Sequence, residues 1–307
     1  MNVNTAIYEA FQVIMRAGTV SGAAKILGRS QPAVSRMIDK LEENLGVKLF
    51  ERRKGQVVPT HAAHLLLDEV EKLFVSLSSL DNFGRRLEEG LEGGVGAACL
   101  PALGLDFMPE VIARFSRTRP QARVVLHVRM SVSVEKWVAT QQVDFGLAET
   151  PFLLSGFETK IFADSNYVAA LPVDHPLAEK AVIRAQDMHG QNLIAWTATV
   201  SARRTFDDVI QGAGIAPRQI IECTMSSPMC RMVQRGLGIA IVDPFTAWTQ
   251  RHPNVVYRPF LPQIPCRFAL LQPKTRAPTA LAGELIGQAE QLRDEALADM
   301  RNQGALL

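Results

Sequence analysis

The sequence has 307 residues, of which 47% are hydrophobic and 21% are charged, and its formal net charge is +2. This is the composition of a soluble globular protein with material for two or three domains. No apolar run reaches the roughly 18 residues that a membrane-spanning helix needs, and the opening residues lack the basic segment and cleavage site of a signal peptide. We therefore expect a cytoplasmic protein with no membrane partner.

The positive charge is concentrated at the start of the chain. Residues 1–60 contain nine Lys or Arg against five Asp or Glu, a net of +4, whereas residues 61–90 contain three against six, a net of −3. The first of these segments also contains the first recognisable motif.

Residues 4–18 predict an opening helix, with Asn4 or Thr5 as its cap and Gly18 at its end. Apolar residues at helical spacing would face inward from it, and these are Ile7, Phe11, Ile14 and Met15.

Residues 21–49 predict two helices joined by a tight turn at Gly28, with Ser30 and Pro32 at the start of the second helix. The inner face of the first helix would be Ala23, Ala24 and Leu27; that of the second would be Val34, Met37, Ile38, Leu41 and Leu45. The opposite face of the second helix has Gln31, Ser35, Arg36, Asp39 and Lys40. The spacing of Ala24, Gly28, Val34 and Met37 is typical of a helix-turn-helix, whose second helix enters the DNA major groove. A helical hairpin with a solvated polar face is the alternative.

Residues 46–60 predict a small hairpin, or wing, because two short β-prone runs flank a basic turn that ends at Gly55. Arg52, Arg53 and Lys54 near its tip would suit phosphates or a minor groove.

The stretch SQPAVSRMIDKLEENLGVKLFER, followed by Pro59 and Thr60, resembles the N-terminal domain of the LysR-type transcriptional regulators of bacteria. The family usually has a glycine shortly after the threonine, where this chain has Ala63. Double-stranded DNA with a partly palindromic operator is the expected partner. We expect base contacts from Gln31, Pro32, Ser35 and Arg36, phosphate contacts from Ser30 and Lys40, and backbone or minor-groove contacts from Arg52 and Arg53.

Residues 61–90 predict a long linker helix. Leu66, Val70, Leu73, Leu77, Leu80 and Leu87 form a heptad seam, with Gly84 at the missing position. The seam favours a dimerising helix, and a helix packed on its own domain is the alternative. The resemblance implies a dimer, usually assembled further into a tetramer.

Residues 91–307 alternate strands with helices, which indicates α/β units. We expect one lobe at about 91–162 and 267–307 and a second at about 163–266, with chain crossings near 161–164 and 266–268. The overall prediction is a mixed fold: an all-α winged helix-turn-helix domain (1–60), a linker helix (61–90) and a two-lobe α/β effector-binding domain. The family resemblance implies that this last domain is similar to the type 2 periplasmic binding proteins.

Ligands of open α/β folds bind beyond the carboxyl ends of the strands. Residues at those positions are the predicted effector site: Pro101, Ala102, Leu103, Ser131, Glu149, Thr197, Thr199, Ser201, Ser226 and Asp243. Hydroxyl groups there would hold a carboxylate, while Glu149 or Asp243 would meet an ammonium group. Residues 236–247 are similar to the subgroup that controls opine catabolism and lysine synthesis, which implies an amino-acid-like effector.

No catalytic or cofactor-binding constellation is recognisable, so we expect a regulator without cofactor or catalytic residues rather than an enzyme. Its four cysteines (Cys99, Cys223, Cys230 and Cys266) show no metal-ligand spacing. A redox switch through Cys223 and Cys230, and DNA binding without any ligand, remain as alternatives. RNA polymerase is a further expected partner.

Overall fold

The computed structural model describes residues 5–53, 56–67, 69–71, 73–74, 77, 94–198, 200–274 and 277–307, without the side chains of residues 52, 53, 56, 201, 219 and 220. The chain divides into two compact units, residues 1–81 and residues 82–307. In the part of the chain that is described, no helix is both long and apolar enough to cross a membrane.

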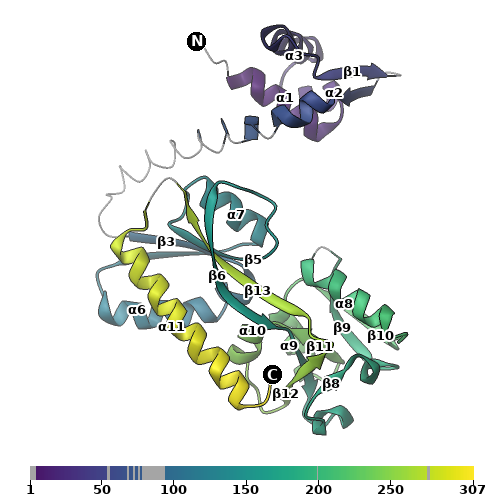
Figure 1. Cartoon of the computed structure of the whole chain (residues 1–307), viewed down its shortest axis with the longest axis vertical. Helices are drawn as coiled ribbons and strands as arrows, with labels where there is room; N and C mark the ends of the chain where they lie inside the picture. Colours follow the sequence, from purple (N-terminus) through teal and green to yellow (C-terminus); the bar gives the residue numbers. More distant parts are fainter. Residues whose placement is uncertain are drawn as a thin grey trace. The chain divides into compact units, whose positions relative to one another are not determined.

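The first unit is a three-helix domain with a β-hairpin (Figure 1). Its elements are α1 (Thr5–Ala17), α2 (Val20–Ile26), α3 (Gln31–Leu45), β1 (Phe50–Arg53) and β2 (Gln56–Pro59). Residues 61–67 are helical again, as are 69–71, 73–74 and 77. The core consists of apolar residues from all three helices and the chain that follows them, including Phe11, Ile14, Val34, Leu41, Leu49 and Val70. This confirms the predicted order of helices and hairpin.

Two details of this unit differ from the sequence prediction. Leu45, expected on the inner face of α3, is 40% exposed because the helix ends there, at the left-handed C-cap Gly46. Val70 is 2% exposed and packs into the core of its own unit. At that position the residue of the heptad seam packs within its own protomer, which agrees with the alternative of a helix packed on its own domain. Leu80, Gly84 and Leu87 lie outside the described residues.

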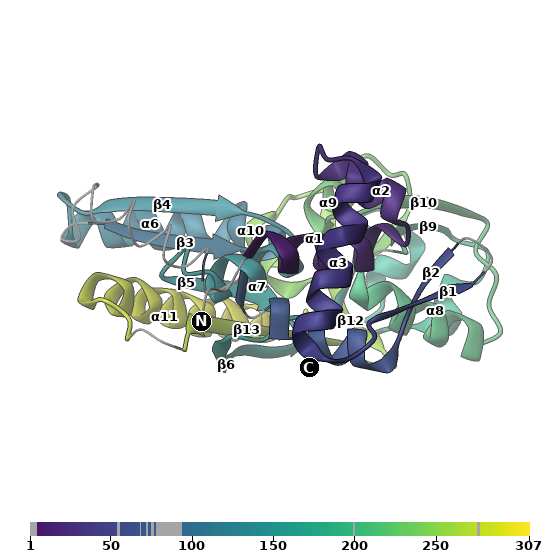
Figure 2. The ribbon, with the colours of Figure 1, turned by 90° about the horizontal axis from the view of Figure 1, so that it is seen from above.

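The second unit contains two mixed sheets, one in each lobe (Figure 2). The lobe I sheet has the order β4-β3-β5-β13-β6, with β3 (Gly94–Cys99), β4 (Arg123–Val128), β5 (Phe145–Glu149), β6 (Phe157–Asn166) and β13 (Pro265–Pro273). The lobe II sheet has the order β10-β9-β11-β7-β12-β8, with β7 (Val168–Pro172), β8 (Ile183–Arg184), β9 (Asn192–Trp196), β10 (Gln219–Cys223), β11 (Ile239–Val242) and β12 (Val255–Leu261).

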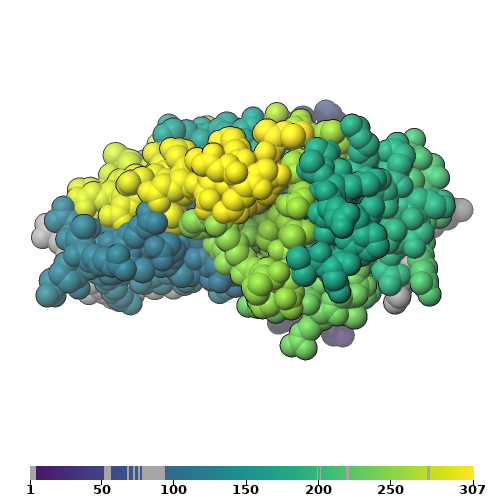
Figure 3. Space-filling view, turned by 90° about the horizontal axis from the view of Figure 1, so that it is seen from below, coloured from purple at the N-terminus to yellow at the C-terminus, as the bar shows by residue number. Residues whose placement is uncertain are grey.

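Helices cover both sheets. They are α5 (Pro101–Gly104), α6 (Phe107–Thr118), α7 (Ser131–Ala139), α8 (Ser201–Gly212), α9 (Ser226–Gln234), α10 (Pro244–Thr249) and α11 (Ala280–Asn302), with short 3-10 turns at Pro176–Glu179 and Ala185–Met188. The closing helix α11 joins lobe I, since Arg114 of α6 pairs with Glu295, and Arg119, the C-cap of α6, pairs with Glu284, both at 2.7 Å. Figure 3 shows α11 (yellow) against the blue surface of lobe I. The green surface of lobe II adjoins lobe I in the same view.

The chain crosses between the lobes a few residues from the predicted places. Residues 161–164 lie inside β6 and residues 266–268 lie inside β13, so both predicted crossings are wrong by a few positions. The crossings are instead the β6–β7 and β12–β13 junctions. The peptide N–H of Tyr167, in the first junction, donates to the carbonyl of Ile264, in the second, at 2.9 Å. The two crossings are thus tied side by side, and we call this pair of crossings the hinge.

Candidate functional sites: the helix-turn-helix face and the cleft between the lobes

The outer face of α3 presents polar side chains to solvent. Ser30, Gln31, Pro32, Arg36 and Lys40 are exposed, and Ser35 is half-buried. Ser30 occupies the N-cap of α3, but its side chain makes no capping hydrogen bond. The Nε atom of Arg36 donates to the carbonyl of Pro32 at 3.3 Å, which holds that side chain along the start of the helix. The residues predicted to contact DNA at the start and along the outer side of α3 are therefore accessible, with Ser35 the least exposed.

A buried glutamate connects α3 to the hairpin. Glu42 is 7% exposed, and its Oε1 accepts the N–H groups of Leu49 at 2.8 Å and Phe50 at 3.0 Å. Its Oε2 accepts from Nζ of Lys48 at 2.5 Å. Burial alone would raise the pKa of Glu42, but the bonds from Lys48, Phe50 and Leu49 outweigh burial and hold the pKa below the ordinary value. The ionised carboxylate thus fixes where the hairpin starts relative to α3.

Thr60 fixes the other end of the hairpin. Its hydroxyl donates to the carbonyl of Lys48 at 2.9 Å and accepts the N–H of Ala63 at 3.2 Å, so it caps the helix that follows. Ala63 is fully buried, and its small side chain fits in the core where the family usually has glycine. The side chains of Arg52 and Arg53, together with Lys54 and Gly55, lie outside the described residues, and the roles of both arginines stay predictions.

A cavity of about 60 Å³ lies between the two lobes at the ends of their strands. Six of the predicted effector residues line it: Pro101, Ala102, Ser131, Glu149, Ser226 and Asp243. Leu103 was predicted wrongly, because the segment is the helical turn α5 and turns this side chain, fully buried, into the core. Thr197 is not among the lining residues either, and its N–H donates to the carbonyl of Cys223 at 3.1 Å. Thr199 and the side chain of Ser201 lie outside the described residues.

Three aromatic residues of the cavity wall were not predicted from the sequence: Tyr167, Trp196 and Phe268. Two of them have a recognisable signal, since Trp196 ends a strand and Tyr167 stands directly before one. Thr224 and Thr246 also line the cavity and were missed.

Both lobes present the same local arrangement to the cavity. Ser131 begins α7, and its Oγ accepts the N–H of Glu149, at the end of β5, at 3.1 Å. Ser226 begins α9, and its Oγ accepts the N–H of Asp243, after β11, at 3.5 Å. The N-cap residues of α7 and α9 are Met130 and Met225, and neither side chain caps its helix. Two helix starts without side-chain caps thus line the cavity, which is an arrangement that favours an anion.

The two acidic residues of the cavity have different surroundings. Asp243 is 2% exposed and caps α10, since its Oδ1 accepts the N–H of Thr246 at 2.8 Å and its Oδ2 accepts the Thr246 hydroxyl at 2.7 Å. Burial raises its pKa despite these bonds. Glu149 is less buried, and its Oε1 accepts the hydroxyl of Tyr167 at 2.6 Å. Because Asp243 is committed to capping α10, Glu149 is the better group for binding a ligand cation.

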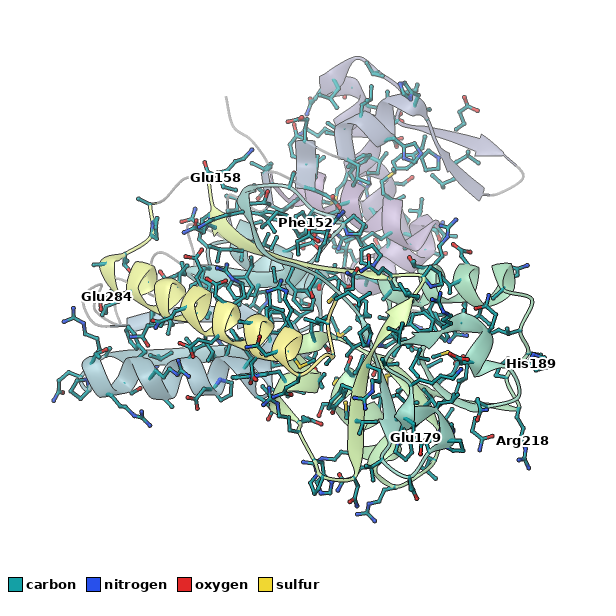
Figure 4. The ribbon with its side chains drawn as sticks, turned by 60° about the horizontal axis from the view of Figure 1, so that its bottom comes forward. Phe152, Glu158, Glu179, His189, Arg218 and Glu284 are labelled. Carbon is teal, nitrogen blue, oxygen red and sulfur yellow. The ribbon has the colours of Figure 1, made fainter. Side chains whose placement is uncertain are left out.

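A larger and more open hollow of about 350 Å³ lies near the C-terminal end of the chain. Its guanidinium groups already have protein partners. Arg251 pairs with Asp299 at 2.5 Å, and Arg258 donates to the carbonyls of Lys180, Tyr257 and Ala178. The cleft between the lobes is therefore the stronger candidate site. Of the residues labelled in Figure 4, Phe152, Glu158 and Glu284 belong to lobe I, and Glu179, His189 and Arg218 belong to lobe II; none of them lines the cleft.

Both units match known families. Residues 7–64 match the family described as bacterial regulatory helix-turn-helix protein, lysR family, and residues 88–293 match the LysR substrate binding domain. The chain belongs to the LysR family of transcriptional regulators. This confirms the resemblance seen in the helix-turn-helix segment and the predicted fold class.

Relatives of the LysR-family chain are similar along nearly its whole length. It is 32% identical to the transcriptional activator protein LysR of Escherichia coli over 288 residues, covering 94% of this chain and 93% of that protein. It is 33% identical to the regulatory protein NocR of Agrobacterium fabrum (90% and 92% covered) and 31% identical to the octopine catabolism/uptake operon regulatory protein OccR of Rhizobium meliloti (94% and 96%).

Solved structures of the family share the fold. Full-length BenM superposes with a TM-score of 0.55 at 19% identity, covering 95% of this chain and 97% of that chain. CbnR, another LysR family regulator, gives a TM-score of 0.52 at 19% identity, covering 94% and 100%.

Proposed function

We propose that this regulator reads DNA with the polar face of α3 and is controlled by a small metabolite with an ammonium and a carboxylate group, held in the cleft between the lobes. The observation that supports this proposal is the composition of the cleft. Its described lining includes Glu149 and Asp243 and no lysine, arginine or histidine. A purely anionic ligand would find no cationic side chain there, whereas an amino-acid-like ligand finds a partner for each of its charges.

In this proposal Glu149 binds the ammonium group. A carboxylate can accept about four hydrogen bonds, so the one from Tyr167 orients Glu149 without saturating it by itself. The ligand carboxylate lies against the helix starts at Ser131 and Ser226, where first-turn N–H groups and the hydroxyl of Ser131 can donate to it. The cavity is far smaller than the roughly 300 Å³ of ordinary ligand pockets, so the lobes open to admit all but the smallest amino acids.

For the DNA-binding unit we propose roles for individual side chains. Gln31, Pro32, Ser35 and Arg36 meet base edges, because the N-terminal residues of a recognition helix enter the groove first. Other contacts go to the DNA backbone or minor groove, from Ser30, Lys40, Arg52 and Arg53.

We further propose that the helix after the wing pairs two protomers, so that two recognition helices read half-sites about one DNA turn or a multiple apart. Dimers pair further into tetramers, and closure of the lobes around the effector changes where the dimers sit along the DNA and so its bend. RNA polymerase is the proposed partner of the bound complex.

A thermal-shift screen tests the effector class. The panel contains amino acids including arginine, lysine and diaminopimelate, the opines octopine and nopaline, and simple mono- and dicarboxylates. A ligand at a hundred times its Kd adds about 2.7 kcal/mol to the free energy of unfolding, which is easily measured. Stabilisation by ammonium-bearing compounds alone supports the proposal, and stabilisation by simple carboxylates alone contradicts it.

The redox alternative is disfavoured by the surroundings of the cysteines. Burial raises the pKa of Cys230 to about 12, so its thiol is protonated at neutral pH and is a poor nucleophile. Replacing Cys223 and Cys230 by serine should leave the oxidant response of DNA binding unchanged, and an oxidant response lost in that variant would revive the alternative.

A further inference from the structure

One side chain connects the cleft, both lobes and the hinge. Tyr167 stands between β6 and β7, and its N–H bond to Ile264 ties the two chain crossings together. It is 4% exposed and lines the cavity. Its backbone therefore belongs to the hinge while its side chain faces the ligand space.

The side chain of Tyr167 contacts residues of both lobes. Its hydroxyl donates to Oε1 of Glu149, the last residue of β5 in lobe I, at 2.6 Å. Its ring packs edge to face with Trp196, the last residue of β9 in lobe II, with 4.8 Å between the ring centroids and 67° between the planes. All three residues line the cavity.

The hydroxyl of Tyr167 is a lasting hydrogen-bond donor, because the phenol keeps its proton. Burial raises the pKa of Tyr167 well above its ordinary value, and the neighbouring Cys266 and Glu149 raise it further. The phenol thus stays protonated and keeps donating to the carboxylate. A ligand ammonium that approaches Glu149 must share that carboxylate with the phenol, and any shift of the phenol moves its ring against Trp196.

We propose that Tyr167 is the positioning residue that transmits the state of Glu149 to lobe II and the hinge. This inference rests on the proposed function, because it assigns the cation-binding role to Glu149. It goes further by separating binding from response: the Tyr167 hydroxyl carries the signal, whereas the bound ligand is held mainly by Glu149 and the helix starts.

Trp196 itself can report the coupling. The sequence has three tryptophans, so the double substitution W137F/W248F in the full chain leaves Trp196 as the only one. The Trp196 emission is then measured without ligand in four proteins. They are the W137F/W248F background itself and the same background with E149A, with Y167F, and with both substitutions. The proposal predicts that E149A shifts the emission when Tyr167 is present and that most of this shift is lost in Y167F. Equal shifts in both backgrounds, or none in either, would overturn it.

A matched control and a second variant complete this double-mutant cycle. Tyr257 also donates its hydroxyl, to the carbonyl of Gln250 at 3.1 Å, and Y257F should leave the E149A shift intact. If Y167F does not fold, E149Q is compared with E149A. The amide oxygen of glutamine can still accept from the phenol, so E149Q should stay closer to wild type, and equal shifts of the two variants would overturn the proposal.

L-Arginine and L-lysine serve as probes in a second arm. Where a probe stabilises the wild type, Y167F should bind it with a Kd within about tenfold of the wild-type value. The ligand-induced shift of the Trp196 emission should disappear in Y167F. A ligand-induced shift of wild-type size in Y167F would overturn the inference. If neither probe nor any other ammonium compound binds the wild type, the proposed effector class fails, and the ligand-free cycle still decides the role of Tyr167.

Discussion

The junction between α3 and the hairpin offers a quantitative prediction. Replacing Glu42 by alanine leaves the N–H groups of Leu49 and Phe50 without their acceptor. An unsatisfied buried group costs about 1–3 kcal/mol, and Phe50 is only half-buried, so its amide can partly recover by bonding water. The exposed Lys48 adds at most about 1 kcal/mol. We expect a local destabilisation of about 2–4 kcal/mol for E42A.

Hydrogen exchange of the full chain measures this effect. The segment 47–53 should exchange about 30- to 700-fold faster in E42A, since each 1.4 kcal/mol is a factor of ten. The exposed neighbour Glu43 gives the control E43A, which should leave the segment unchanged. An acceleration below about threefold, or an equal one in E43A, would show that the Glu42 carboxylate does not hold this segment in place.

The same carboxylate predicts a pH dependence. Because the pKa of Glu42 is lowered in the folded state, its stabilisation is fully present above the pKa of the unfolded chain and is lost as the pH falls through the folded value. The difference between wild type and E42A should therefore be constant near neutrality and shrink below about pH 4–5. A difference that grows on acidification would contradict this account.

Four further substitutions test the two sites and the lobe I core. K40A should weaken binding to all DNA sequences and reduce the slope of log K against log salt by about 0.9, whereas R36A should relax base preference in a competition assay; uniform weakening by R36A would contradict its assignment. S131A should weaken effector binding in calorimetry by about tenfold, through the lost hydroxyl and the unpaired N–H of Glu149, and unchanged affinity would remove Ser131 from the site. G146A should destabilise the chain by about 1–3 kcal/mol in urea denaturation, because its Cβ would lie 2.6 Å from Cγ1 of Val134; unchanged stability would show that α7 shifts freely.

The helix-turn-helix was readable because its local signals agree. The apolar period and the cap at Ser30 predicted α3, and Gly28 and Gly46 take the positive φ angles of 62° and 66° that a turn and a helix end require. Sequence reasoning also placed the strand ends of both lobes well enough to find Ser131, Glu149, Ser226 and Asp243.

The features that were not predicted, or were predicted wrongly, depend on tertiary structure that the local sequence does not encode. The strand β6 was not predicted because residues 158–161 of this edge strand are exposed, so no alternating pattern is present. Leu103 was assigned to the cleft because a four-residue helix such as α5 is too short to give a period. Tyr167 and Trp196 look like core residues in the sequence, where their positions beside strand ends are the sole signal of the cavity that their buried rings line.

The most direct test of the central claim is calorimetric titration with three matched ligands. These are the amino acid that stabilises the protein best in the screen, its 2-hydroxy acid, which lacks the ammonium group, and its amide, which lacks the carboxylate. Only the amino acid should bind the wild type tightly, and E149Q should lose at least about tenfold in affinity for it. Equal affinity of wild type and E149Q, or tighter binding of the hydroxy acid, would contradict an ammonium-binding cleft.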